Sequence, residues 1–187
     1  VLDKYNVKVT FFVTNTHPDY QNLIAEEAKR GHTVAIHSAS HKYDQIYTSE
    51  QAFFDDLEQM NSIIKAQTGN DASIIRFPGG SSNTVSKDYC PGIMTQLVND
   101  VTARGLLYCD WNVSSGDANS KPISTEQVVQ NVISGVQSHN VSVVLQHDIK
   151  DFSVNAVEQI IQWGQANGYT FLPLTTSSPM SHHRVNN

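Results

Sequence analysis

Two histidines separated by three residues are the first candidates for chemistry in this sequence. His37 and His41 lie in the stretch AIHSASHKYD, directly after a short apolar run at residues 33–36. If the chain turns into a short helical loop there, residues i and i+4 face the same side, and both imidazoles can reach one metal ion. A carboxylate as third ligand would keep such an ion electrophilic and open to water. The alternative is a pair of solvated loop histidines, which the spacing alone does not exclude.

A second group with chemical potential is the stretch RFPGG at residues 76–80. The planar guanidinium of Arg76 can clamp a carboxylate through two hydrogen bonds. The turn that contains Gly79 can point backbone N–H groups at a developing oxyanion. The alternative is a surface arginine in front of an ordinary turn.

The third group combines a histidine with two aspartates. The stretch VVLQHDI delivers His147 at the end of an apolar run, where histidine can act as a general acid near neutral pH. The stretch DWNVSSGDA offers Asp110 and Asp117 as partners that orient His147, and Trp111 as an apolar wall. The sequence leaves open which aspartate has this role, and a structural histidine and a packed tryptophan are the alternatives.

The elements that must position these residues follow from periodicity. Apolar runs rich in β-branched and aromatic residues alternate with stretches of helical period, which predicts repeated β-α units and a mostly parallel sheet. Strands are predicted at residues 7–14, 33–36, 73–77, 106–112, 141–146 and 170–172. Helices are predicted at residues 20–30, 50–68, 92–104, 125–137 and 154–167.

The predicted helices have recognisable ends. Gly31, Gly69, Gly105 and Gly168 each follow a helical stretch, where a left-handed residue is easiest for glycine. Ser124, with a glutamine three residues later, predicts a capping box at the start of one helix.

In a parallel β/α protein, the carboxyl ends of the strands meet at one face, where sites are normally built. The polar and aromatic side chains at or just after the ends of the predicted strands are Asn15, Thr16, His37, His41, Arg76, Asp110, Trp111, Asn112, His147 and Asp148. We therefore expect the three candidate groups to gather on that face.

Composition narrows the classes of function. A chain of 187 residues with 39% hydrophobic residues predicts one domain, residues 1–187. The net charge of -6 and the absence of a Lys/Arg cluster argue against binding to nucleic acid or to an anionic membrane. The longest apolar runs are far below the roughly 20 residues of a membrane span, so we expect a soluble chain without one.

Two further features bear on processing and redox state. The chain begins with Val1 and has no leader, which we interpret as a start created by cleavage or by omission of a secretory signal. Cys90 and Cys109 permit one disulfide, but two buried thiols are the interpretation we favour. Neither cysteine has the spacing of a metal or redox motif.

Taken in order, the motifs resemble one family. The segments VKVTFFVTN, HSASH, RFPGGSSN, DWNVSSGDA, LQHD and HHRVNN, spread over nearly the whole chain, resemble the polysaccharide deacetylases of the NodB-homology type. These are metal-dependent carbohydrate esterases, and the DWNVSSGDA segment is similar to that of bacterial peptidoglycan N-acetylglucosamine deacetylases. The resemblance implies an α/β fold, a distorted (β/α) barrel, here lacking its first strand. It also implies hydrolysis of N-acetyl groups on a glycan, peptidoglycan or chitin-like, and an extracytoplasmic protein, secreted or associated with the cell envelope.

The resemblance also implies the metal chemistry. A divalent ion, usually zinc, would be bound by His37, His41 and an aspartate. Water on this ion, deprotonated by a second aspartate, would attack the acetyl carbonyl. The ion and the backbone N–H of Gly79 would hold the resulting oxyanion.

The remaining roles follow from the same resemblance. His147 would protonate the leaving amine, and Leu145 would line the pocket for the acetyl methyl group. Arg76 would keep the catalytic aspartate ionised.

The sequence departs from the family in several places. Both family aspartates belong to a Thr-Phe-Asp-Asp-Gly motif that these residues lack and that the family places before the equivalent of Val1. We therefore expect an N-terminally incomplete deacetylase. The alternatives are a non-catalytic glycan-binding protein that retains the fold and, more remotely, an unrelated β/α metal hydrolase.

Two departures concern the site itself. Many members carry an aromatic residue where this chain has Gly79, and Trp111 is a candidate for the missing wall. The family also has an aspartate at the place of Ser114 and a tryptophan at that of Ala118, so Asp117 and Asp110 both remain candidates to orient His147.

Overall fold

Short parallel strands alternate with helices along the whole chain. The computed structural model describes residues 1–187, which form two compact units. Unit 1 comprises Val1–Lys8 and Trp111–Leu172, and unit 2 comprises Val9–Asp110 and Pro173–Asn187. Each unit thus combines segments distant in sequence, and the single domain stays a prediction.

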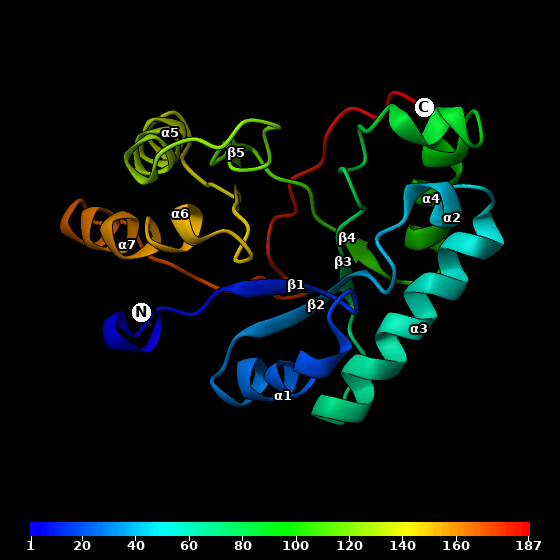
Figure 1. The fold of residues 1–187 in the computed structure, drawn as a ribbon, viewed down its shortest axis with the longest axis horizontal. Coiled ribbons are helices and arrows are strands. Elements are labelled where there is room, and N and C mark those ends of the chain that lie inside the picture. The colour runs from blue at the N-terminus through cyan, green and yellow to red at the C-terminus, as the bar shows by residue number, and fades with distance from the viewer. The chain divides into compact units, whose positions relative to one another are not determined.

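Unit 2 contains a four-stranded parallel sheet in the order β1-β2-β3-β4 (Figure 1). The strands are β1 (Thr10–Thr14), β2 (Thr33–Ser38), β3 (Ile74–Ile75) and β4 (Leu107–Tyr108). Their β-branched and aromatic side chains suit a sheet covered by helices. Because the strands are parallel, the residues that follow β2, β3 and β4 leave the sheet at the same edge.

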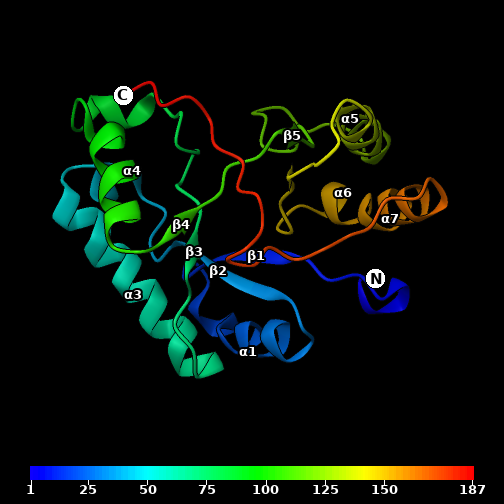
Figure 2. The ribbon, with the colours of Figure 1, turned by 180° about the vertical axis from the view of Figure 1, so that it is seen from behind.

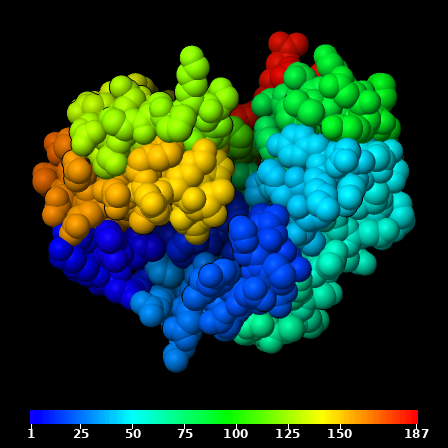
Figure 3. All heavy atoms as spheres, viewed as in Figure 1, coloured from blue at the N-terminus to red at the C-terminus, as the bar shows by residue number.

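Helices cover the sheet of unit 2. They are α1 (Asn22–Lys29), α2 (Tyr43–Ile46), α3 (Glu50–Thr68) and α4 (Ile93–Ala103), with 3-10 turns at Pro18–Tyr20 and Val85–Asp88. Helices α1 and α3 pack on β2, and α4 packs beside β4 and α3. Their outer surfaces are visible in Figure 3, α1 in blue and α3 in cyan to turquoise. Large buried side chains such as Ile36, Phe77 and Leu97 form the core between helices and sheet.

Unit 1 is a smaller β/α assembly. A 3-10 turn at Asp3–Tyr5 precedes β5 (Val113–Ser114), α5 (Thr125–Gln137), β6 (Val144–Leu145), α6 (Asp151–Val154) and α7 (Val157–Ala166). Strands β5 and β6 are parallel. A core rich in valine lies between α5, α7 and β5, and includes Val113, Val128 and Val132.

The end of the chain belongs to unit 2 and has no regular secondary structure. Residues Pro173–Asn187, in red in Figure 2, run from β1 past the end of β4 to α4. The backbone of Leu174 binds the hydroxyl groups of Thr10 and Thr33, at 2.7 Å each. At the other end, Asn187 accepts hydrogen bonds from the backbone N–H groups of Gly92 and Thr95.

The helix predictions are largely confirmed. Helices α3 and α5 have the predicted bounds, and the four glycines after helices all have positive φ angles. The hydroxyl group of Ser124 accepts a hydrogen bond from the backbone N–H of Gln127, as the capping motif predicts. The predicted helix at residues 154–167 corresponds to α7, and the short helix α6, which precedes it, was not predicted.

The strand predictions need three corrections. Most strands are shorter than predicted, because only a few residues of each apolar run find a neighbouring strand. The predicted strand at residues 106–112 ends at Tyr108, and β5 begins a separate sheet. Residues 170–172 form no strand, because no other strand pairs with them, and the ring of Phe171 packs against Gly164 in unit 1.

The structure also bears on the predictions about the cysteines and about membrane-spanning helices. Cys90 and Cys109 are both free thiols, as favoured, although only Cys109 is fully buried. Among the helices, none combines the length and the apolar character that a membrane crossing requires.

Candidate active site

The two metal-ligand candidates lie together in unit 2 at the carboxyl end of β2. The ring centroids of His37 and His41 are 5.0 Å apart, with planes inclined by 54°. The Nδ1 atom of His37 lies 2.7 Å from the backbone carbonyl oxygen of Arg76. A metal-ligating histidine usually makes such a bond, which sets the tautomer and makes Nε2 the ligating atom.

The backbone that joins the histidines differs from the expectation. His37 is still part of β2, and His41 has a positive φ angle of 56° before α2 begins. A sharp bend, not a helical turn, therefore brings the two rings to the same side. The expected helical loop is wrong, although the rings do meet.

A carboxylate from α3 holds this bend. Asp56 accepts hydrogen bonds from the Ser38 hydroxyl group at 2.6 Å and from the backbone N–H groups of Ala39 at 2.9 Å and Ser40 at 2.8 Å. Ser38 in turn accepts a hydrogen bond from the backbone N–H of His41 at 2.8 Å. Asp56 was not predicted from the sequence, because nothing local marks an aspartate in the middle of a helix as a partner of a distant bend.

Arg76 lies at the end of β3 and is buried. Its guanidinium group donates hydrogen bonds to the carbonyl oxygens of Cys109 and Asp110, at 2.8 and 2.9 Å, and stacks over the ring of Phe12. Burial lowers the pKa of Arg76, but arginine stays charged in proteins. The arginine therefore ties β3 to the end of β4, and its proposed hold on a catalytic carboxylate stays a prediction.

The turn after Arg76 has one exposed residue. Gly79 is exposed, whereas Phe77, Pro78 and Gly80 are buried. The turn is closed by a hydrogen bond of 2.8 Å from the N–H of Gly80 to the carbonyl oxygen of Phe77, and Gly79 has a φ angle of 78° that favours glycine. The backbone of Gly79 is thus presented on the same edge of the sheet as His37 and His41.

Asp110, one of the two candidates to orient His147, is fully buried in unit 2. Its carboxylate accepts hydrogen bonds from the backbone N–H and the hydroxyl group of Ser81, at 2.8 and 2.5 Å, and from the backbone N–H of His183 at 2.9 Å. Within unit 2, Asp110 therefore links the glycine turn to the end of the chain.

Asp117, the other candidate, is hydrogen-bonded to His147 in unit 1. One carboxylate oxygen lies 2.8 Å from Nδ1 of His147, and the other accepts hydrogen bonds from the backbone N–H of His147 at 2.7 Å and the hydroxyl group of Ser153 at 2.6 Å. Lys150 also donates to the backbone carbonyl of Asp117. Of the two aspartates left open by the sequence, Asp117 is the one in contact with the histidine.

The environment of Asp117 favours its charged form. Burial alone would raise the pKa of Asp117, but the hydrogen bonds from His147 and Ser153 outweigh this and hold the pKa well below its usual range. A carboxylate at Nδ1 favours the tautomer with its proton on that atom, so Nε2 is the nitrogen that can exchange a proton with a substrate.

The two apolar candidates also belong to unit 1. Leu145 ends β6 two residues before His147 and is half-buried. Trp111 is half-buried and precedes β5. Their roles as walls of a substrate pocket stay predictions.

His37 and His41 can supply some, but not all, of the ligands of a metal ion. Two imidazoles with ring centroids 5.0 Å apart can both reach one ion, and the Arg76 carbonyl sets the orientation of His37. No group of three or more His, Cys, Asp or Glu side chains able to hold a metal occurs within residues 1–187. The pair thus matches two of the three ligands expected from the sequence.

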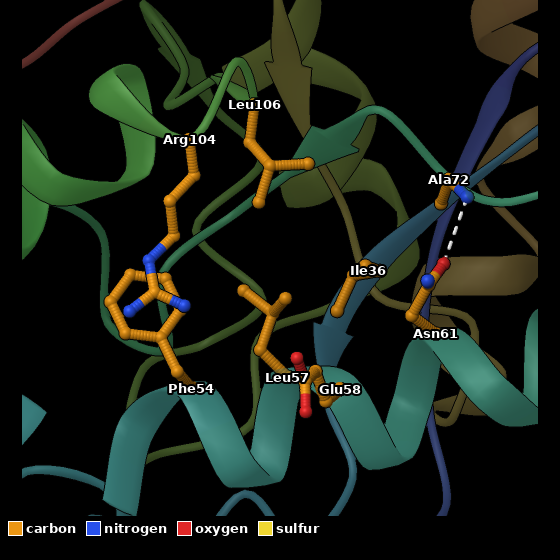
Figure 4. Close-up of a pocket in the computed structure, with 8 residues that line it drawn as sticks. All are labelled: Ile36, Phe54, Leu57, Glu58, Asn61, Ala72, Arg104 and Leu106. Atoms are coloured by element: carbon orange, nitrogen blue, oxygen red, sulfur yellow. Dashed lines mark hydrogen bonds between the residues drawn. The ribbon is translucent and has the colours of Figure 1, made fainter. Parts of the chain in front are cut away.

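A pocket of unit 2 lies apart from the candidate catalytic and metal-binding residues. It has a volume of about 200 Å³ and is lined by Ile36, Phe54, Leu57, Glu58, Asn61, Ala72, Arg104 and Leu106 (Figure 4). The guanidinium of Arg104 covers the ring of Phe54 at 3.4 Å from its centroid. None of the candidate catalytic or metal-binding residues lines this pocket.

Known proteins resemble this chain in sequence. A sequence model of the family described as polysaccharide deacetylase matches residues 1–90. A peptidoglycan N-acetylglucosamine deacetylase of Bacillus cereus is 28% identical over 175 residues, which cover 91% of this chain and 60% of that protein. The chain therefore spans less than two thirds of that curated relative.

Solved structures show the same similarity in three dimensions. The catalytic domain of a peptidoglycan N-acetylglucosamine deacetylase from Eubacterium rectale is 97% identical, with a TM-score of 0.99, over 100% of this chain and 84% of that one. A polysaccharide deacetylase from Bacillus cereus is 25% identical, with a TM-score of 0.77, over 99% of this chain and 86% of that one. The α/β content and the parallel strands fit the distorted (β/α) barrel predicted from the sequence. The chain belongs to the polysaccharide deacetylases, carbohydrate esterases that include the peptidoglycan N-acetylglucosamine deacetylases.

Proposed function

We propose that the protein is a metal-dependent hydrolase that removes acetyl groups from N-acetylglucosamine in peptidoglycan. The observation that carries this proposal is the pair of imidazoles at the end of β2, with His37 oriented by the carbonyl oxygen of Arg76. The choice of peptidoglycan, with chitin-like glycans as the other option, rests on the relatives from Eubacterium rectale and Bacillus cereus, which are both described as peptidoglycan N-acetylglucosamine deacetylases.

In this proposal His37 and His41 hold a divalent ion, for which zinc is the candidate because imidazole ligands suit it. Such an ion supplies Lewis acidity, which polarises the amide carbonyl and acidifies water. Residues 1–187 contain no Thr-Phe-Asp-Asp-Gly segment, to which the family resemblance assigns the third ligand and the base.

The groups of the chain itself would act on the amide as follows. The backbone N–H of Gly79 donates a hydrogen bond to the carbonyl oxygen as negative charge develops there. His147, held through Nδ1 by Asp117, delivers a proton from Nε2 to the leaving nitrogen as the carbon–nitrogen bond breaks. One water is consumed, and the products are acetate and the free amine of the sugar.

We extend the proposal to the location of the protein. A wall glycan is reached only outside the cytoplasm, so we expect the protein to be extracytoplasmic. Fractionation of cells that produce it tests this expectation.

The test combines zinc content with acetate release from N-acetylated peptidoglycan and from chitin oligomers. It uses residues 1–187 and, in parallel, the same chain extended by the part of the Eubacterium rectale protein outside the shared 84%. Acetate release by residues 1–187 alone would show that the aspartates of the absent segment are not required. Glycan binding without acetate release in both forms would favour the non-catalytic alternative.

Two variants separate the proposed roles. His37→Ala is expected to remove bound zinc together with activity, because it deletes a ligand. His147→Ala is expected to retain zinc and to lower kcat by about 10²–10⁴-fold, the usual contribution of a general acid. His17→Ala, at an exposed histidine, is the control. Equal loss of zinc in the first two variants would contradict these assignments.

A further inference from the structure

Tyr43, at the start of α2, lies directly against the exposed glycine of the RFPGG turn. A Cβ atom placed on Gly79 would be 2.6 Å from the hydroxyl oxygen of Tyr43 and 3.4 Å from the ring carbon that bears it. The hydroxyl group therefore occupies the space that a side chain at position 79 would need.

The ring of Tyr43 is fixed by other aromatic side chains. Its centroid lies 5.5 Å from that of Tyr47, nearly perpendicular at 85°, and 5.7 Å from that of His41. These distances are typical of attractive aromatic contacts. The hydroxyl position is thus set by packing before any ligand arrives.

The carbonyl groups on either side of Gly79 have partners within the chain. The hydroxyl group of Tyr47 donates to the carbonyl oxygen of Pro78 at 2.7 Å, and the amide of Asn83 donates to that of Gly80 at 3.0 Å. By contrast, neither the backbone N–H of Gly79 nor the hydroxyl group of Tyr43 forms a hydrogen bond within the chain. Two donors without an acceptor therefore lie side by side.

The separation of these donors suits one acceptor atom. The backbone nitrogen of a residue lies about 2.5 Å from its Cβ, so the nitrogen of Gly79 and the hydroxyl oxygen of Tyr43 are within about 5 Å of each other. An oxygen that accepts bonds of about 2.7–3.1 Å from each donor can bridge that distance.

We propose that Tyr43 contacts the substrate, and that its hydroxyl group and the N–H of Gly79 together hydrogen-bond the acetyl oxygen during hydrolysis. This inference rests on the proposed function and adds a side chain to its oxyanion site. The donors are held in place before the reaction, so their bonds strengthen as charge develops on the oxygen, which lowers the barrier more than it strengthens binding.

The first test is the variant Tyr43→Phe, which keeps the ring and removes only the hydroxyl group. We expect kcat for acetate release to fall at least about 10-fold, because loss of one oxyanion donor costs on the order of 10²-fold. The KM for the glycan should change less than about threefold. The melting temperature should stay unchanged, since no hydrogen bond within the chain is lost. Tyr20→Phe, at an exposed tyrosine of the same unit, should behave as wild type.

A second measurement does not depend on turnover. Sodium acetate is titrated into the metal-free chain, and the NMR shift of the Gly79 amide is followed. We expect Tyr43→Phe to weaken acetate binding at least about fivefold, the loss of one hydrogen bond to a charged oxygen.

The outcomes separate the two proposals. Weaker acetate binding in Tyr43→Phe, with no acetate release from any glycan by the wild type, would refute the proposed function and support the role of Tyr43. Wild-type kcat and wild-type acetate affinity in Tyr43→Phe would overturn the inference. A Gly79 amide that does not respond to acetate would overturn it as well.

Discussion

At the scale of single residues, the best defined contact among the candidates is that between Asp117 and His147. Asp117 is buried, and its carboxylate binds both the ring nitrogen Nδ1 and the backbone N–H of His147. A hydrogen-bonded carboxylate of this kind prefers to be ionised, which is why its pKa is low despite its burial. The hydrogen bonds that orient the imidazole of His147 therefore also make the stability of the fold depend on pH.

The predicted consequence concerns Asp117→Asn. A carboxylate with a lowered pKa in the folded state stabilises the protein above its ordinary pKa of 3.8, and this stability is lost as the pH falls through the folded-state value. The free energy of unfolding of the variant at pH 7 should therefore be about 2 kcal/mol lower than that of the wild type. Between about pH 4 and pH 2, its free energy of unfolding should fall less steeply than that of the wild type.

Urea unfolding at a series of pH values measures both effects. Asp148→Asn, at an exposed neighbour of His147, should retain the slope of the wild type. Parallel curves for wild type and Asp117→Asn would show that Asp117 has no such coupling.

At the scale of elements, α3 supports the metal candidates of β2. The helix begins at a serine cap, in which the Ser49 hydroxyl group accepts a hydrogen bond from Ala52, and it packs along β2. One turn later it presents Asp56 to the bend between His37 and His41. The position of His41 thus depends on a residue of a different element.

We predict that Asp56→Ala weakens zinc binding about 10- to 100-fold, the usual effect of losing a residue that supports a metal ligand. Two backbone N–H groups and one hydroxyl group would lose their acceptor, so the bend would no longer hold the ring of His41. Zinc affinity is measured by competition with a chelator. Asp55→Ala, the exposed neighbour that binds only Gln51, should keep wild-type affinity, and equal affinities in both variants would refute the role of Asp56.

At the scale of the whole molecule, each unit is closed by chain segments far apart in sequence. In unit 2, the segment Pro173–Asn187 runs beside the ends of β1 and β4 and reaches α4 (Figure 2). The backbone of Asp110 donates to Ser181, and its carboxylate accepts from His183. The end of the chain thereby completes the hydrogen bonds of a buried charge next to the glycine turn.

Deletion of residues 181–187 should lower the free energy of unfolding by at least about 2 kcal/mol, because a buried carboxylate loses a donor. Arg184→Ala, at an exposed residue of the same segment, should change it by less than about 0.5 kcal/mol. Chemical denaturation gives these values, and hydrogen exchange should show the loss of protection in unit 2. A deletion as stable as the wild type would show that the segment is dispensable for the fold.

The sequence by itself determined the helices and the type of sheet. The periodicity of α3 and α5, the glycines after helices and the serine cap of α5 are local properties, and local properties can be read from neighbouring residues. It also singled out His37, His41, Arg76, Asp110 and His147, because polar residues at the ends of apolar runs are few, and it left Asp117 open beside Asp110 as partner of His147.

Tertiary structure alone decided the contacts between these residues. The choice of Asp117 as partner of His147, the support of Asp56 for the bend, and the contact of Tyr43 with Gly79 each join residues of different elements. Strand lengths were decided in the same way, since a strand extends only where another lies beside it. The physical reason is that a hydrogen bond depends on the position of both partners, and only the packing of the folded chain brings partners distant in sequence within about 3 Å.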